Sequence, residues 1–198
     1  HVDGFYFTNS GGPCFRLYQS GDVKITRCFA DGRGPGYAPF FIVARDTSNI
    51  LMKNCVVMTI FHAMQFNNCP DLRLENNVWS RNLIQAYILV NPPEAKAYVE
   101  NNIFTDSVPH KATVLLFEVS RFESLRMKNN CYFLRMSDEE RKMFAFYGGT
   151  GPEIFNALLG RASLRAYEEQ VGATTDSIFV NPDFAWMKRV EPLPEDAD

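Results

Sequence analysis

The sequence has no basic excess and no long apolar run, and each absence excludes a class of protein. Lys and Arg number 20 against 23 Asp and Glu, for a formal net charge of −3, whereas nucleic-acid binding needs a clear basic excess. No apolar run approaches the roughly 18 residues of a membrane-spanning helix. We therefore predict neither a nucleic-acid partner nor a membrane span.

Closely spaced pairs of cysteines are also missing. Cys14, Cys28, Cys55, Cys69 and Cys131 show no CxxC spacing, which argues against a zinc site or a thioredoxin-like motif. The odd count leaves at least one thiol free, and we interpret the cysteines as small core residues, because Cys is often buried. The hydrophobic fraction of 46% and the aromatic fraction of 14% are typical of one ordered domain with a sizeable core.

A short pattern recurs along the chain. Its copies are "VKITRCFA" from Val23, "ILMKNCVV" from Ile50, "LRLENNVW" from Leu72, "AYVENNIF" from Ala97 and "LRMKNNCY" from Leu125. Each copy alternates apolar and variable residues, as a strand with one buried face does. A corner of Asn (Arg in the first copy) and then Asn or Cys follows, at spacings of 27, 22, 25 and 28 residues. We interpret "FYFTNS" from Phe5 as a degenerate sixth copy.

Each repeat also contains a second apolar strand. These strands begin near Cys14, Phe40, Ala63, Ala86, Thr113 and Met143. Units of 22 to 28 residues with only strands and turns are too short for a crossover helix between parallel strands. They suit a solenoid in which coils stack with strands about 4.8 Å apart.

The repeated corner resembles the right-handed parallel β-helix repeats of the pectin-lyase-like superfamily, over roughly residues 2–147. The resemblance implies an all-β fold: a right-handed parallel β-helix of five to six coils over residues 1–150. In that family the first corner Asn tolerates a left-handed backbone, and stacked Asn side chains hydrogen-bond along the axis. Here the second corner position runs from thiol to amide: Cys28, Cys55, Asn77, Asn102 and Asn130.

Residues 151–198 are expected to cap the solenoid. An amphipathic helix is predicted from Ser163, its candidate N-cap, to Gly172, its stop. A strand and an Asn-Pro-x-Phe turn follow, which resembles the closing segment of many bacterial secreted β-helix proteins. A secreted, periplasmic or cell-surface location is therefore expected.

The other end of the chain begins directly with strand-like residues. The opening "HVDGFYF" contains no initiator Met, signal peptide or cap. We therefore expect the chain to be part of a longer protein, with a missing N-terminal region as a partner of the first coil.

Stacking turns equivalent positions of the repeat into columns. One outward column, Lys24, Leu51, Arg73, Tyr98 and Arg126, is cationic with an aromatic residue and could bind an acidic glycan. The next column is Thr26, Lys53, Glu75, Glu100 and Lys128. We expect ion pairs of Lys53 with Glu75 and of Lys128 with Glu100. Glu75 and Glu100 could instead form the carboxylate pair of a retaining glycosidase, although the lysines would keep both ionised.

Irregular connections gather other polar residues at one edge. A polysaccharide lyase needs a cation for the uronate carboxylate and a base for the C5 proton. The catalytic candidates are His62, Arg81, Asp106 and His110, and the substrate-binding candidates are Arg33, Tyr37, Arg73, Tyr98 and Arg126. No cluster of stacked aspartates for Ca²⁺ is recognisable, so no cofactor is predicted, and Ca²⁺ stays open as the alternative without an assigned site.

Two functions stay open at this stage. The first is a carbohydrate-directed module that processes or binds an acidic polysaccharide, as a lyase, a glycosidase-like enzyme or a binding domain. The alternative is a non-catalytic scaffold or interaction module. No catalytic motif decides between them, and a fold alone does not fix function.

Overall fold

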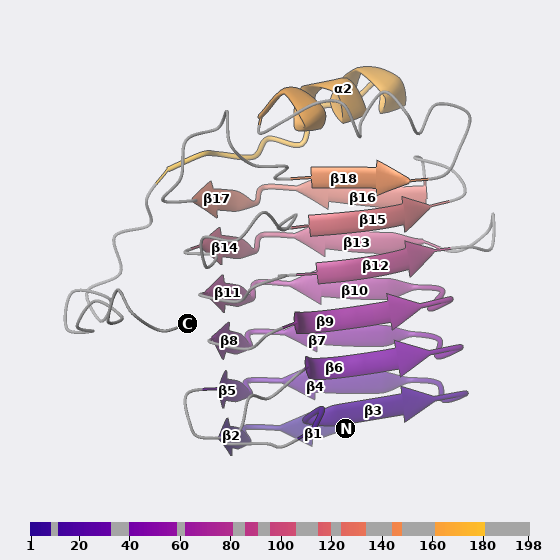
Figure 1. Ribbon diagram of the computed structural model, residues 1–198, viewed down its shortest axis with the longest axis vertical. Coiled ribbons are helices and arrows are strands. Elements are labelled where there is room, and N and C mark those ends of the chain that lie inside the picture. The colour runs from indigo at the N-terminus through magenta and orange to yellow at the C-terminus, as the bar shows by residue number, and fades with distance from the viewer. Residues whose placement is uncertain are drawn as a thin grey trace, which may run out of the picture.

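A computed structural model describes residues 1–8, 12–32, 40–58, 62–80, 86–90, 96–105, 115–119, 124–133, 144–147 and 161–180. Within these ranges, three sheets, each of six parallel strands, extend along one axis, and a helix lies over the C-terminal end of the stack (Figure 1). The chain visits the three sheets in the same order in every coil. The parallel solenoid confirms the predicted fold class.

Sheet A contains the strands that precede the Asn corners. They are β1 (Val2–Asp3), β4 (Val23–Thr26), β7 (Ile50–Lys53), β10 (Leu72–Glu75), β13 (Ala97–Glu100) and β16 (Leu125–Lys128). Alternation holds as predicted: in β10, Leu72 and Leu74 are fully buried, whereas Arg73 is exposed.

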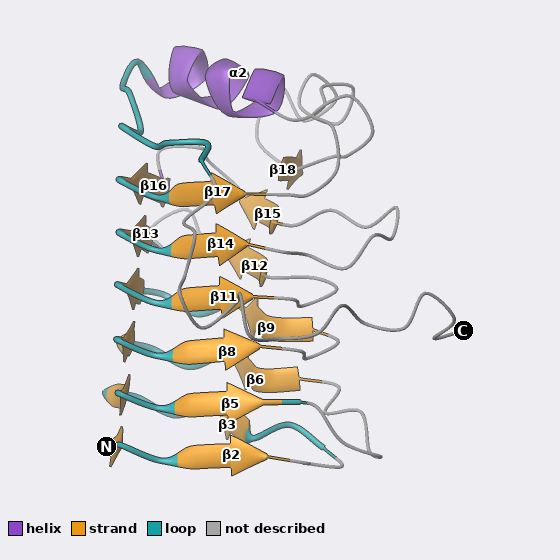
Figure 2. Ribbon diagram, turned by 90° about the vertical axis from the view of Figure 1, so that its left-hand side faces the viewer, coloured by secondary structure: helices purple, strands orange, loops and turns teal. Residues whose placement is uncertain are grey.

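Sheet B contains short strands directly after each corner (Figure 2). They are β2 (Tyr6–Thr8), β5 (Phe29–Asp31), β8 (Val56–Met58), β11 (Val78–Ser80), β14 (Ile103–Thr105) and β17 (Cys131–Phe133). Our prediction of two strands per coil was therefore wrong, because a coil has three. Strands of three residues are too short to show a period-two pattern in the sequence.

Sheet C contains the predicted second strands. They are β3 (Phe15–Tyr18), β6 (Phe40–Arg45), β9 (His62–Asn67), β12 (Ala86–Val90), β15 (Leu115–Val119) and β18 (Phe144–Tyr147). The three returns from sheet C to sheet A that the structure describes in full make tight turns with pairs of positive-φ residues three positions apart. These pairs are Gln19 and Asp22, Asp46 and Asn49, and Asn68 and Asp71.

The corner between sheets A and B has the predicted left-handed backbone in every repeat copy. The φ angles lie between 52° and 57° at Arg27, Asn54, Asn76, Asn101 and Asn129. Asn adopts this conformation more readily than most residues, so the backbone bends at the same point of each coil.

The second corner residues form a buried hydrogen-bond ladder. The side-chain Oδ1 of Asn77 accepts from the Cys55 backbone N at 2.9 Å, and Asn102 Oδ1 accepts from the Asn77 backbone N at 3.1 Å. Each Nδ2 donates to a backbone carbonyl of the preceding coil, as Asn102 does to Leu74 O at 2.8 Å. Cys55 Sγ lies 3.6 Å from Ile25 O in the same arrangement. The Cys55 thiol therefore makes a weaker hydrogen bond to the preceding coil than the side-chain amides of Asn77 and Asn102 make.

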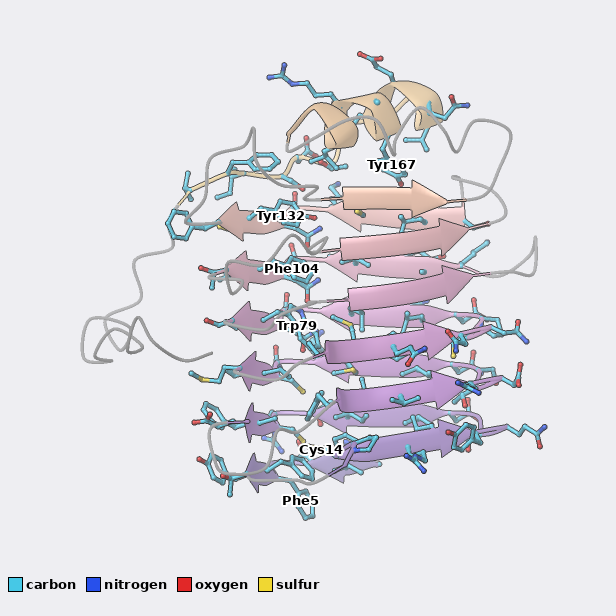
Figure 3. The ribbon with its side chains drawn as sticks, viewed as in Figure 1. Phe5, Cys14, Trp79, Phe104, Tyr132 and Tyr167 are labelled. Carbon is cyan, nitrogen blue, oxygen red and sulfur yellow. The ribbon has the colours of Figure 1, made fainter. Side chains whose placement is uncertain are left out.

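The first coil has a different register from the one we predicted. β1 pairs with β4 so that Val2 lies beside Ile25, which puts Gly4, with φ of 72°, in the corner column. Our assignment of "FYFTNS" from Phe5 as a copy of the repeat was therefore wrong. Glycine adopts the left-handed backbone without a Cβ penalty, so Gly4 can replace the corner Asn. Phe5 then occupies the ladder position and is 57% exposed at the open end (Figure 3).

The closing segment repeats the corner once more. Asp176, with φ of 50°, follows Asn129 in the corner column, and Ser177 Oγ lies 3.4 Å from the Asn130 backbone N. A parallel bridge joins Ile178 to Cys131. Residues 175–180 therefore form part of a further coil on top of β16 and β17.

The helix α2 (Arg161–Val171) contacts both β16 and the start of the closing segment, where Glu168 Oε1 accepts from the Thr175 backbone N at 2.7 Å. Its buried Tyr167 donates a hydrogen bond to the carbonyl oxygen of Leu125 in β16. Gly172, with φ of 66°, ends the helix as predicted. Ser163 lies inside the helix, so its assignment as N-cap was wrong: the helix begins two residues earlier, at Arg161. No helix of the described residues is long and apolar enough to cross a membrane.

The interior cysteines should resist thiol reagents. Burial raises the pKa of Cys55 and Cys69 to about 11, and only the thiolate is strongly nucleophilic. We expect both to react slowly with iodoacetamide at pH 8 in the native protein and quickly after denaturation. Peptide mapping by mass spectrometry measures this, with the half-buried Cys14 as internal reference. Equal labelling of all three in the native state would contradict the buried assignment.

The same shift predicts how stability changes with pH. The unfolded thiols lose their protons near the ordinary value of 9.0, before the folded ones do. The free energy of unfolding should therefore fall as pH rises from 9 toward 11.

Candidate glycan-binding face

The outer face of sheet A gathers the charged residues of the repeat. The strands pair in register, so that Arg73 lies beside Leu51 on one side and Tyr98 on the other. Tyr98 in turn lies beside Arg126. The outward column predicted from the sequence is therefore present, with its members on successive coils about 4.8 Å apart.

A cation–π contact organises the middle of this column. The Arg73 guanidinium carbon lies 5.1 Å from the centroid of the Tyr98 ring. The Arg73 guanidinium is exposed, and the cation–π contact with the ring does not use its N–H donors. Stacking on the ring restricts the Arg73 side chain and presents a planar fork of donors to solvent.

Cations recur on alternate coils of the column. Lys24, Arg73 and Arg126 lie on β4, β10 and β16, and all three side chains are exposed. Two strand spacings separate neighbouring cations, which is about 10 Å. The face therefore presents positive charges in a line parallel to the solenoid axis.

Ion pairs fill the neighbouring column. Lys53 Nζ lies 3.0 Å from Glu75 Oε2, as predicted. Glu100 pairs with Arg126 at 3.1 Å (Nε to Oε1), not with Lys128 as we expected. Lys128 lies directly opposite Glu100 in the register, but the longer arginine side chain reaches the carboxylate diagonally, which neighbours on one face can do.

The glycosidase hypothesis for Glu75 and Glu100 gains no support from this arrangement. The two residues lie opposite each other in β10 and β13. Each carboxylate is bound to a basic side chain of an adjacent coil. A retaining glycosidase needs one carboxyl group as a proton donor. We therefore interpret the two glutamates as ion-pair partners that hold Lys53 and Arg126 in place.

At the first coil, Asp3 continues the second column beside Thr26. Arg27 Nε donates to Asp3 Oδ1 at 2.8 Å, and Thr26 Oγ1 donates to the same oxygen at 2.7 Å. The hydrogen bond from Arg27 is the main cause that lowers the pKa of Asp3 to about 2. This carboxylate is therefore ionised at every physiological pH.

The two outward columns have a positive balance. Five basic residues, Lys24, Lys53, Arg73, Arg126 and Lys128, outnumber three acidic ones, Asp3, Glu75 and Glu100. The face therefore has a formal charge of +2, whereas the whole chain has −3. This local excess is the electrostatic property that an acidic polymer would recognise.

Of the other candidate residues, only His62 lies in a described element. His62 begins β9 in sheet C, and its side chain is not among those described. Arg33, Tyr37, Arg81, Asp106 and His110 lie outside the described residues. The catalytic assignment made from the sequence stays a prediction. Among the described residues, no group of three or more His, Cys, Asp or Glu side chains could hold a metal ion.

Comparison with known proteins supports the fold assignment. Residues 2–132 match the model of the family described as the right handed beta helix region. The match covers more than half of the chain, so the chain belongs to this family. No curated protein and no solved structure matches it.

Proposed function

We propose that this β-helix is a carbohydrate-directed module that binds an acidic polysaccharide along the outer face of sheet A. The observation that supports this most directly is the line of exposed cations Lys24, Arg73 and Arg126, with Tyr98 stacked under the central guanidinium. Arg recognises carboxylates with two parallel hydrogen bonds. The Tyr98 ring adds an apolar surface with a polar tip, which suits a sugar.

The spacing favours a polymer with regularly repeated carboxylates. Binding at three sites on one chain adds their contributions, because the second and third contacts become intramolecular. A stiff solenoid holds these sites at fixed separations of about 10 Å. A secreted or cell-surface location would bring the protein to such polymers and belongs to the same proposal.

Substitution of the central arginine tests the proposal. We expect Arg73→Ala to weaken binding to polygalacturonate or alginate about tenfold or more, because a charge-assisted hydrogen bond contributes about 1.5 to 3 kcal/mol. Arg126→Ala should weaken it similarly, and added salt should weaken binding of the parent protein. Isothermal titration calorimetry against a panel of uronate polysaccharides measures each effect.

The matched control is Arg165→Ala. Arg165 is an exposed arginine on α2, away from sheet A, so its loss removes one charge without touching the face. If Arg73→Ala and Arg165→Ala weaken polysaccharide binding equally, binding depends only on the net charge of the protein and not on the outer face of sheet A. Absence of binding across the whole panel would overturn the proposal and favour the scaffold alternative.

The lyase hypothesis is tested in the same samples. Elimination produces an unsaturated sugar that absorbs in the ultraviolet, so absorbance during incubation separates cleavage from binding alone. Binding without absorbance change would leave a non-catalytic binding module. Absorbance that disappears in Arg81→Ala or His62→Ala would support the catalytic assignment.

A further inference from the structure

The first outward column of sheet A alternates between cationic and apolar side chains, with one residue on each coil. In chain order it consists of Lys24, Leu51, Arg73, Tyr98 and Arg126, on β4, β7, β10, β13 and β16. These strands lie one above another (Figure 1). The cations therefore lie on alternate coils, and an apolar side chain separates each cation from the next.

Ion pairs cancel the charge of the two intervening coils. On β7, Lys53 Nζ lies 3.0 Å from Glu75 Oε2. On β13, Glu100 Oε1 lies 3.1 Å from Arg126 Nε. Each of these two strands has one charged residue in the outward columns, and that residue is bound to an opposite charge. Neither β7 nor β13 therefore presents unbalanced positive charge to a ligand.

Positive charge remains on β4, β10 and β16. Among the described residues, Lys24 and Arg73 have no carboxylate partner. On β16, Arg126 and Lys128 together face one carboxylate, that of Glu100. The unbalanced positive charges therefore repeat at every second strand, which is about 10 Å.

The coil between Arg73 and Arg126 is unsuited to a carboxylate. Its outward residue Tyr98 has its ring against the Arg73 guanidinium, at 5.1 Å from the guanidinium carbon to the centroid. Glu100 shares the outer face of the same strand, two positions further on. A ligand carboxylate on this coil would lie near a like charge and would lose water against the ring, and both effects are unfavourable. A neutral sugar meets neither penalty.

We propose that the outer face of sheet A selects a polysaccharide in which acidic and neutral sugars alternate, an inference that rests on the proposed function. One sugar of an extended chain has a length comparable to one strand spacing, so a chain along the solenoid axis places one sugar on each coil. The acidic sugars then lie at Lys24, Arg73 and Arg126. The neutral sugars lie at Leu51 and Tyr98. A polymer with an acid on every sugar would place every second carboxylate on a coil without unbalanced positive charge.

A comparison of two polymers tests the alternation in the full chain. Hyaluronan has a carboxylate on every second sugar, whereas polygalacturonate has one on every sugar. We expect the parent protein to bind hyaluronan at least about fivefold more tightly than polygalacturonate of equal length in sugars, because misplaced like charges are costly. Attraction by net charge alone gives the opposite order, since polygalacturonate has twice the charge. Isothermal titration calorimetry measures both affinities.

The two proposals fail in different ways. Equal or tighter binding of polygalacturonate by the parent protein would overturn the alternation and leave the proposed acidic-polysaccharide function intact. Absence of binding to every acidic polysaccharide would overturn the proposed function, and the alternation with it.

Tyr98→Lys tests which coil makes the selection. It adds a cation between Arg73 and Arg126 and removes the ring, so the preference for hyaluronan should disappear or reverse. Leu51→Lys, on the other apolar coil, should act in the same direction, whereas Tyr98→Phe keeps the ring and should keep the preference. A preference that survives both lysine variants would overturn the assignment of neutral sugars to these coils.

Gln170→Lys is the matched control for added charge. Gln170 is exposed on α2, away from sheet A. The variant adds the same charge as Tyr98→Lys and should leave the ratio of the two affinities unchanged. If Gln170→Lys changes this ratio as much as Tyr98→Lys does, the selection depends on net charge, and the inference is wrong.

Discussion

Replacement of Asn102 by leucine should cost about 3 to 5 kcal/mol of stability. Asn102 is buried, and its Oδ1 accepts from both the backbone N and the Nδ2 of Asn77, at 3.1 and 3.0 Å. Its Nδ2 donates to Leu74 O at 2.8 Å. Leucine fills similar space but removes these bonds, so the Asn77 backbone N and the Leu74 carbonyl each lose a partner, whereas Asn77 Nδ2 keeps its bond to Met52 O. Each buried unsatisfied group costs about 1 to 3 kcal/mol. Equilibrium denaturation in guanidinium chloride measures the loss.

The adjacent residue provides the control. Asn101 is exposed and has φ of 57°. Glycine adopts this backbone freely, so Asn101→Gly should change stability by less than about 1 kcal/mol. Comparison of the two variants therefore separates the stability that the amide ladder contributes from the stability that the corner backbone contributes. Full stability of Asn102→Leu would mean that the amide ladder contributes nothing.

Removal of the Phe104 ring should be equally costly. Phe104 is fully buried in sheet B, and its ring stacks on Trp79 at 6.4 Å and on Tyr132 at 5.5 Å. Figure 3 shows the three side chains one above another inside the solenoid. Phe104→Ala leaves a cavity in this column, for which about 3 to 5 kcal/mol is typical. The Trp79 emission should change as well, because its neighbouring ring is lost.

Tyr98→Ala is the comparison for this experiment. Tyr98 is an aromatic residue of the same coil, but it lies on the outer face and is half-buried. Its loss removes an exposed cation–π contact with Arg73, which contributes about 0.5 to 1 kcal/mol. Thermal unfolding followed by circular dichroism compares the two variants. Similar losses would contradict the assignment of Phe104 to the interior.

Both predictions depend on the repeat, and the repeat was readable because solenoid contacts are local. Each coil packs on the next, so one pattern in the sequence specifies every interface. The apolar pair Leu72 and Leu74 and the corner Asn76 followed by Asn77 were assigned correctly to core, turn and ladder. The pairing of Lys53 with Glu75 followed from the same register.

Some elements could not be predicted, for identifiable reasons. Gly4 replaces the corner Asn in the first coil, so a search for Asn placed that coil wrongly. Asp176 and Ser177 continue the corner columns in the closing segment without either asparagine. In both places, the backbone conformation is repeated while the residue that usually adopts it is not.

The candidate site, too, could be predicted from the sequence only in part. Sequence columns identified Arg73, Tyr98 and Arg126, because regular strands fix which residues share a face. The preference of Glu100 for Arg126 over Lys128 was decided by side-chain reach in three dimensions. The loop candidates Arg81 and His110 have no repeat to fix their positions, and they stay predictions.

The sequence by itself determined the solenoid, its parallel register and its amide ladder, because these follow from a local pattern repeated at a short period. Only the tertiary structure revealed the third sheet, whose three-residue strands are too short to carry a periodic signal. It also revealed that Tyr6 and Ile178 belong to one column of sheet B, since their segments come into register only when the coils stack.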